Sequence, residues 1–178
     1  MRMDRSRGKT AAQWLAGARE TEISEALARY GDEPDAKIVA AALAALAAAG
    51  RSPKTTGELA AAVTSAKNMG AERFLKKDAF SAHPATRTFQ ALRIVVNSER
   101  ESLAQLLRDL PSLLRRGGRA VFLTFHSGEE ALVGDALRAQ AAAGFWRAPL
   151  ADPRRPSPQE VRKNPRARSA RLWRVVRA

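Results

Sequence analysis

The sequence contains no cysteine, so it can form neither disulfide bonds nor thiolate metal sites. Only two histidines are present, which without cysteines are too few for a structural zinc site. No apolar run approaches the roughly 20 residues of a membrane-spanning helix, so we expect no membrane partner. None of the 11 glycines forms the G-x-G pattern of a nucleotide-binding loop. The informative feature that remains is charge.

Positive charge is abundant and is concentrated near the carboxyl end. The formal net charge is +13 and the isoelectric point is near 11.3. The last 25 positions hold nine basic residues and a single acidic residue, Glu160, which gives this segment a balance of +8. This balance favours a polyanion such as RNA as the partner, because arginine forks bind phosphates in a bidentate manner. The alternative is a solvated basic tail that binds nothing.

Short helices are predicted for the first 80 or so residues. Capping signals mark four helix starts, at Thr10, Thr21, Pro34 and Thr55. The first and the last are capping boxes, completed by Gln13 and Glu58. Gly31 and Gly50 are placed to end the second and third helices. The polar, basic stretch 67–82 is expected to be a loop or a frayed turn, and this helical section holds no catalytic constellation.

The segment "HPATRTFQALRIVVN", residues 83–97, predicts a helix with an apolar face and a crowded polar face. The apolar arc contains Phe89, Leu92 and Val96, and the polar face gathers Arg87, Gln90, Arg93 and Asn97. Planar groups with several donors suit phosphates and base edges, whereas the alternative is an amphipathic helix with a solvated polar side. We expect Thr86 or Thr88 to cap this helix, and the helix to continue through Leu110.

After the glycine pair at 117–118 the pattern changes from helical to extended. The apolar run 120–125 predicts a strand buried on both faces, followed by a helix over 129–140. Two further short strands are predicted at 145–147 and 172–176. Together these elements are typical of an open α/β sheet, in which ligands bind at the carboxyl ends of strands.

Two polar residues, His126 and Ser127, stand at the end of the predicted strand. Taken alone, His126 is best interpreted as a hydrogen-bonded residue that closes the strand, and Ser127 as a helix N-cap. Trp173 lies between apolar residues and is more typical of a core position than of a platform for base stacking.

Three stretches, in this order, resemble the MraW-type small-subunit rRNA methyltransferases. They are "HPATRTFQALRIVVN" followed by Glu99, "GGRAVFLTFHS", and "NPRARSARLWRV". The initial "MRMD" is also similar to the stretch that precedes the family's helical insertion, so the resemblance covers essentially the whole chain. One motif departs from the family, because Gly128-Glu129-Glu130 stands where the family has Leu-Glu-Asp.

The resemblance implies an α/β fold, a partial class I methyltransferase (Rossmann-like) sheet with an inserted all-helical domain. Residues 1–9 would end a preceding sheet segment, 10–82 would form the helical substrate-recognition insertion, and 83–178 would supply the last helices and strands. The implied reaction is methylation of a cytosine N4 in small-subunit rRNA by S-adenosylmethionine.

The resemblance also implies roles for individual residues. Asp4 is the implied acceptor for the cytosine amine, with His126 and Ser127 orienting the base or contacting the cofactor's edge. The implied RNA-binding residues are Arg87, Gln90, Arg93, Asn97, Asn164, Arg166, Arg168 and Arg171.

In this family the glycine-rich loop that holds S-adenosylmethionine lies upstream of "MRMD". We therefore expect no S-adenosylmethionine binding by this chain alone. Three explanations stay open: a truncated gene product, one half of a split enzyme that joins a cofactor-binding half or a homodimer partner, and a degenerate descendant that binds rRNA without chemistry. A DNA-binding helical protein is disfavoured, because the basic charge lies outside the short helices. The expected location is cytoplasmic, with a mitochondrion or plastid as the alternative.

Overall fold

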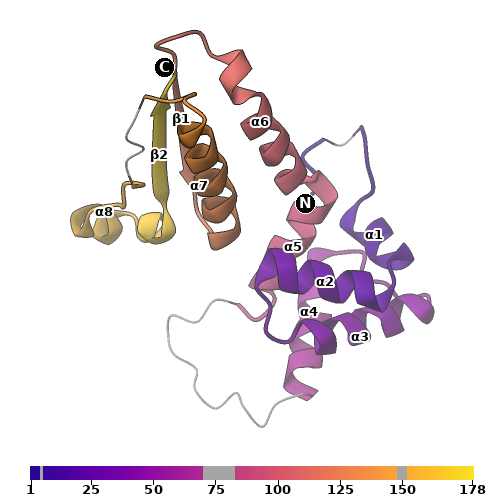
Figure 1. Ribbon diagram of the computed structural model, residues 1–178. Coiled ribbons are helices and arrows are strands. Elements are labelled where there is room, and N and C mark those ends of the chain that lie inside the picture. The colour runs from indigo at the N-terminus through magenta and orange to yellow at the C-terminus, as the bar shows by residue number, and fades with distance from the viewer. Residues whose placement is uncertain (5, 70–82, 148–151) are drawn as a thin grey trace. The chain divides into compact units, whose positions relative to one another are not determined.

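The structure is a computed structural model that describes residues 1–4, 6–69, 83–147 and 152–178. The chain divides into two compact units, Met1–Glu99 and Arg100–Ala178. Among the described residues the first unit is helical and the second combines helices with a small sheet (Figure 1). Each unit has its own cluster of buried apolar side chains. The fold is therefore mixed α/β, as the sequence predicts.

The helical unit is built from short helices with slim alanine faces. In the described part of the unit these helices are α1 (Ala11–Gly17), α2 (Glu20–Gly31), α3 (Ala36–Ala48), α4 (Thr56–Met69) and α5 (Thr86–Asn97). Helix α2 packs between α3 and α5, and α3 also contacts α1 and α4 (Figure 1). The fully buried aliphatic residues of this core include Leu15, Ile23, Leu27, Val39, Leu43, Val63 and Leu92.

The two predicted capping boxes are confirmed. The Thr10 hydroxyl accepts from the Gln13 N–H at 3.1 Å, and the Gln13 side chain accepts from the Thr10 N–H at 2.8 Å. The same reciprocal pair joins Thr55 and Glu58, at 3.2 and 3.4 Å. Both patterns are local, which is why four consecutive residues suffice to predict them.

The predicted ends of the second helix are wrong. Helix α2 begins at Glu20, ahead of Thr21, with Arg19 as its N-cap, and the left-handed residue that ends it is Asp32 (φ 47°) rather than Gly31. Gly31 is the last helical residue, and a Cβ atom there would lie 2.6 Å from the main-chain oxygen of Arg87. This glycine therefore allows the close approach of α5, a long-range requirement.

The single long helix predicted from residue 84 through Leu110 is in fact two helices. Ser98 adopts a left-handed conformation (φ 48°), which ends α5 and begins α6 (Glu99–Leu113). The predicted cap is also wrong, because Ala85 is the N-cap residue and Thr88 is fully buried within the helix. The His83 Nδ1 atom accepts from the Ala85 N–H at 3.1 Å in place of a threonine cap.

The second unit contains a two-stranded antiparallel sheet in its described part. Strand β1 (Arg119–Thr124) pairs with β2 (Arg171–Val176), and helix α7 (Ser127–Ala142) packs against both strands (Figure 1). A short helix α8 (Pro158–Lys163) and a 3₁₀ turn η1 (Pro165–Ser169) precede β2. No strand forms at 145–147 as predicted. This segment makes a single isolated antiparallel bridge, between Trp146 and Arg177.

Strand β1 is buried on one face only, which corrects the prediction of burial on both. The Thr124 side chain is buried, but Val121 is 64% exposed and Leu123 is 54% exposed. Helix α7 covers the opposite face, and β2 pairs with one edge of β1. Within the described residues nothing pairs with the other edge, so an apolar strand has an uncovered face and an open edge.

A proline inside α6 is compensated by a glutamine from α7. Pro111 has no N–H to donate to the Leu107 carbonyl, and the Gln140 Nε2 atom donates to that oxygen at 2.6 Å. The Gln140 Oε1 atom accepts from the Trp146 indole N–H at 3.1 Å. One side chain thus joins α6, α7 and the segment that leads away from α7.

Candidate functional site

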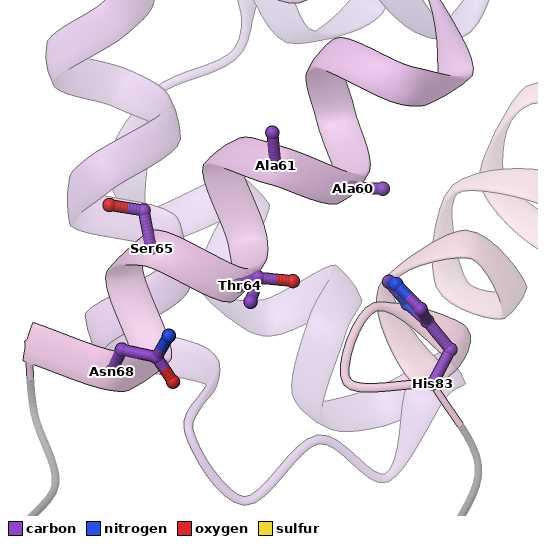
Figure 2. Close-up of a pocket in the computed structure, with 6 residues that line it drawn as sticks. All are labelled: Ala60, Ala61, Thr64, Ser65, Asn68 and His83. Carbon is purple, nitrogen blue, oxygen red and sulfur yellow. The ribbon is translucent and has the colours of Figure 1, made fainter.

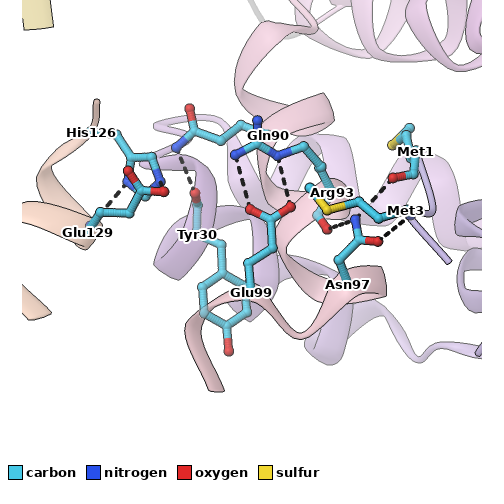
Figure 3. A network of polar contacts seen from close by, with 9 residues as sticks. All are labelled: Met1, Met3, Tyr30, Gln90, Arg93, Asn97, Glu99, His126 and Glu129. Atoms are coloured by element: carbon cyan, nitrogen blue, oxygen red, sulfur yellow. Dashed lines mark hydrogen bonds and ion pairs between the residues drawn. The ribbon is translucent and has the colours of Figure 1, made fainter. Parts of the chain in front are cut away.

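The polar face of α5 is engaged by partners inside the helical unit (Figure 3). The Gln90 Nε2 atom donates to the Tyr30 carbonyl at 3.0 Å, and an Arg87 Nη1 atom donates to the Asp32 carbonyl. These carbonyls lie at the end of α2, where the last carbonyl groups of a helix accept no hydrogen bond from N–H groups of the same helix. Two of the predicted RNA-binding side chains therefore satisfy the end of a neighbouring helix.

Arg93 is paired with the first residue of α6. Its Nε atom lies 3.0 Å from Glu99 Oε1, and its Nη2 atom donates to Glu99 Oε2 at 3.1 Å, so both prongs of the guanidinium contact one carboxylate (Figure 3). The pair compensates the charge of Arg93 across the break at Ser98. The Arg93 side chain is still 45% exposed, and its contacts with Glu99 use only two of its five N–H donors.

Asn97, the last predicted member of this face, holds the amino-terminal segment (Figure 3). Its Oδ1 atom accepts from the Met3 N–H at 2.7 Å, and its Nδ2 atom donates to the Met1 carbonyl at 3.0 Å. Nδ2 also donates to the Arg93 carbonyl at 2.8 Å. Both amide hydrogens are used, because a primary amide carries only two.

Asp4, the predicted acceptor, lies just beyond this anchored segment. Its Oδ1 atom accepts from the Ser6 hydroxyl at 2.6 Å and from the Ser6 N–H at 2.8 Å. These two bonds, and the nearby Arg2 guanidinium, hold the pKa of Asp4 below its ordinary value. The exposed carboxylate is therefore ionised at neutral pH and can accept hydrogen bonds.

His126 and Ser127 follow the end of β1, as predicted, but the helix N-cap is His126 and not Ser127. His126 is the N-cap of α7, since its Nδ1 atom accepts from the Glu129 N–H at 3.3 Å, and Ser127 is the first residue of the helix. The His126 Nε2 atom lies 3.2 Å from Glu129 Oε1, and Glu129 Oε2 accepts from the Phe125 N–H. Because Nδ1 accepts, the neutral ring carries its hydrogen on Nε2, facing this carboxylate.

The basic residues near β2 divide into free and paired groups. Asn164, Arg166 and Arg168 are exposed in and beside η1, and among the described residues no carboxylate forms an ion pair with either arginine. Arg171 instead pairs with Glu130 at 3.5 Å, and its side chain is 17% exposed. Trp173 is buried in the core, as predicted, and so does not stack on a ligand.

An open pocket of about 570 Å³ lies on helix α4 beside His83 (Figure 2). The lining side chains are small or polar: Ala60, Ala61, Thr64, Ser65, Asn68 and His83. Thr64 projects toward the side where His83 lies, whereas Ser65 points the other way (Figure 2). Among the described residues the lining contains no carboxylate and no arginine, so these six residues include none of the predicted catalytic or RNA-binding residues.

Sequence comparison decides between the classes of protein that this geometry allows. The model of the MraW methylase family matches residues 1–178. The chain belongs to the MraW methylase family. The resemblance stated from three short stretches is therefore confirmed over the whole sequence.

The curated relatives carry a common description. A protein of Azoarcus sp. strain BH72 described as "Ribosomal RNA small subunit methyltransferase H" is 43% identical over 185 residues, which cover 96% of this chain and 56% of the relative. Proteins of the same description from Methylobacillus flagellatus and Bordetella pertussis are 42% and 44% identical, and the aligned part covers 56% and 49% of their lengths. The chain spans about half the length of the curated relatives that it matches.

The described residues do not fit S-adenosylmethionine, the cofactor that the family implies. The glycine pair precedes β1 instead of following a strand, and a Cβ at Gly118 would lie 2.7 Å from the Arg115 carbonyl, so this glycine serves a tight turn. At the carboxyl end of β1 the carboxylates of Glu129 and Glu130 already contact His126 and Arg171. No helix among the described residues is long and apolar enough to cross a membrane.

Sequence reasoning missed one charged pair in the helical unit. The sequence predicts a loop or frayed turn at Lys67, but this residue lies in α4, and its Nζ atom is 2.7 Å from the Glu33 carboxylate and 2.8 Å from the Pro84 carbonyl. Both side chains are buried. The only signal for this ion pair in the sequence is that Lys67 follows the apolar positions of α4 by one helical turn. Residues 70–82 of the same predicted loop lie outside the described residues.

Proposed function

We propose that this chain is the substrate-recognising and carboxyl-terminal part of a methyltransferase that acts on N4 of a cytosine in small-subunit rRNA. The observation that carries the proposal is membership of the MraW methylase family over residues 1–178. The descriptions of the relatives, as small-subunit rRNA methyltransferases, support the substrate class. The bacterial sources of these relatives favour the bacterial cytoplasm as the compartment.

In this proposal the helical segment 10–82 is an insertion in a class I methyltransferase sheet and recognises the RNA. The arginines of η1 bind phosphates, and Asn164 lies next to them. Arg166 and Arg168 have exposed side chains and no ion-pair partner among the described residues. The Arg93 side chain, which is 45% exposed, adds a second contact, on α5. Arginine forks suit this task because they bind phosphate oxygens in pairs.

Asp4 is the proposed acceptor for the hydrogens of the cytosine amine. The lone pair of that nitrogen is delocalised into the ring, so the amine needs an acceptor that aligns it through its N–H groups and takes up the one proton released when the methyl group is transferred. The two hydrogen bonds from Ser6 lower the pKa of Asp4 and so favour its ionised form. S-adenosylmethionine would supply the methyl group, and we assign its binding to residues outside those described. The contribution of this chain is orientation of the base, which can account for a large part of a transfer rate.

The open side of β1 is the proposed docking surface for the part of the enzyme that binds the cofactor. The curated relatives are nearly twice the length of the matched segment, so the remainder is large enough for several more strands. Exposed Val121 and Leu123, beside an unpaired strand edge, are suited to a neighbouring strand and the helix that covers it. An edge-to-edge homodimer is less favourable, because two copies of a strongly basic chain repel each other.

Methyl incorporation in a mixture of two halves tests the proposal. The chain would be combined with the separately produced amino-terminal part of the Azoarcus relative, cut before the residue that aligns with Met1. Transfer of a tritiated methyl group to small-subunit rRNA is expected for the mixture and for neither half alone. Leu123→Asp is expected to abolish complex formation, and Ile38→Asp, at an exposed apolar position on α3, is the matched control.

The second candidate is a non-catalytic rRNA-binding or ribosome-assembly module. The exposed basic segment favours it, because that segment needs no cofactor to bind RNA. A demonstrated complex of the two halves that binds rRNA but transfers no methyl group would favour this candidate.

A further inference from the structure

Asn97 lies on the polar face of α5, but its contacts differ in kind from those of an RNA-binding residue. All three of its hydrogen bonds go to main-chain atoms, at 2.7, 2.8 and 3.0 Å. Two of the three anchor Met1 and Met3, which lie more than 90 positions away in the sequence. Both Nδ2 hydrogens are spent, so an RNA acceptor would have to displace one of these bonds.

The segment that Asn97 holds leads directly to Asp4. Beyond Met3 the chain turns back on itself, because the Arg2 guanidinium donates to the Gly8 carbonyl at 2.8 Å and the Ser6 N–H donates to Asp4. Gly8 has a positive φ of 73°, which permits this turn. The turn fixes the shape of the loop, and the bonds to Asn97 fix its position against α5.

We propose that Asn97 is a positioning residue that sets the place of the Asp4 carboxylate by clamping the main chain of Met1 and Met3. This inference rests on the proposed function for the role of Asp4, but the clamp itself is a property of the helical unit alone. The clamp explains why an asparagine ends the polar face of α5, because a primary amide can accept a hydrogen bond from one peptide group and donate one to another.

Three variants separate the clamp from general helix stability. Asn97→Ala removes every contact. Asn97→Asp keeps an acceptor for the Met3 N–H and loses the donors to the Met1 and Arg93 carbonyls. Asn68→Ala, at an exposed position on α4, is the matched control for replacing a helical asparagine.

The first measurement is hydrogen exchange of the labelled chain by NMR. In Asn97→Ala we expect protection of the Met3 amide to fall about tenfold, while α5 amides such as that of Ile94 stay protected. Protection of Met3 should be retained in Asn97→Asp and in Asn68→Ala. Unchanged protection of the Met3 amide in Asn97→Ala would refute the clamp, independently of whether the chain binds rRNA or supports its methylation.

The second measurement separates positioning from RNA contact in the mixture of halves. If Asn97 positions Asp4, Asn97→Ala lowers kcat at least tenfold and changes the KM for rRNA less than about twofold, and Asn97→Asp recovers part of kcat. A raised KM and raised Kd for rRNA with unchanged kcat would overturn the inference, because Asn97 would then be an RNA contact. If the unmodified halves transfer no methyl group, the proposed function fails, and Met3 exchange together with the Kd for rRNA still decides the clamp.

Discussion

Replacing Glu33 by alanine should destabilise the helical unit more than any surface substitution. The Glu33 side chain is fully buried, and the Lys67 side chain that it binds is 7% exposed. Removing the carboxylate leaves the buried Lys67 ammonium group with the Pro84 carbonyl as an acceptor but without a counter-charge, and leaves the Asp35 N–H without its 3.2 Å acceptor. Breaking a buried ion pair from one side costs about 3 to 5 kcal/mol. This is a large part of the roughly 5 to 15 kcal/mol that stabilises an ordinary domain.

The matched control removes both charges at once. In Glu33→Leu with Lys67→Met, apolar groups of similar size replace the pair, and such replacements are often close to neutral. Urea denaturation would be followed by NMR, so that amides of the second unit serve as an internal reference. We expect the single variant to lose at least about 3 kcal/mol of unfolding free energy and the double variant to lose clearly less. A loss below about 1 kcal/mol in the single variant, or equal losses in both, would refute the reasoning.

Three further outcomes are expected. Replacing Arg166 and Arg168 together by alanine should lower the salt-dependence slope of rRNA binding by about 1.4 to 1.8. Arg171→Ala should lower the slope less per residue, because Arg171 is already paired with the Glu130 carboxylate. Equal effects per residue would contradict this expectation. Calorimetric titration of the chain alone with S-adenosylmethionine should show no binding, and a micromolar Kd would contradict the expectation. Ser6→Ala should raise the pKa of Asp4, because its hydroxyl bond is the largest cause of the lowered value. Any stability from this bond is present above the unfolded-state pKa and is lost as pH falls through the lower folded-state pKa. An NMR titration of the Asp4 carboxyl that is the same in Ser6→Ala as in the unmodified chain would contradict this prediction.

Features that depend on neighbouring residues could be predicted from the sequence. The capping boxes at Thr10 and Thr55 need only four residues each, and both are present. Strand β1 and helix α7 lie within two residues of their predicted bounds, because the change from a helical to an extended apolar pattern is abrupt after residue 118. Family membership could also be predicted, since it rests on the order of residues and not on their contacts.

Features that depend on distant partners could not be predicted. Val96 and Leu103 are seven positions apart and fit one helix face across the polar stretch 97–102, and only the left-handed backbone at Ser98 shows that two helices are present. Gly31 looks like a helix terminator in isolation, yet what requires it is the Arg87 carbonyl, 56 positions away. The run over 120–125 is apolar enough for burial on both faces, but burial depends on a second layer that the described residues do not supply.

The polar face of α5 shows most clearly where sequence reasoning stops. The residue types predict donors, and the structure does use them as donors. Arg93 donates to the Glu99 carboxylate, but the acceptors for Arg87, Gln90 and Asn97 include the main-chain carbonyls of Asp32, Tyr30 and Met1. Every residue except proline has the same main-chain groups, so no pattern of side chains can mark these three as acceptors. A face that is built to bind phosphates and a face that is built to join three segments of one chain therefore have the same sequence signature. What separates them is whether each donor already has an acceptor. On α5 this condition distinguishes Asn97, which has no amide hydrogen left, from Arg93, whose guanidinium has N–H donors beyond the two that contact Glu99.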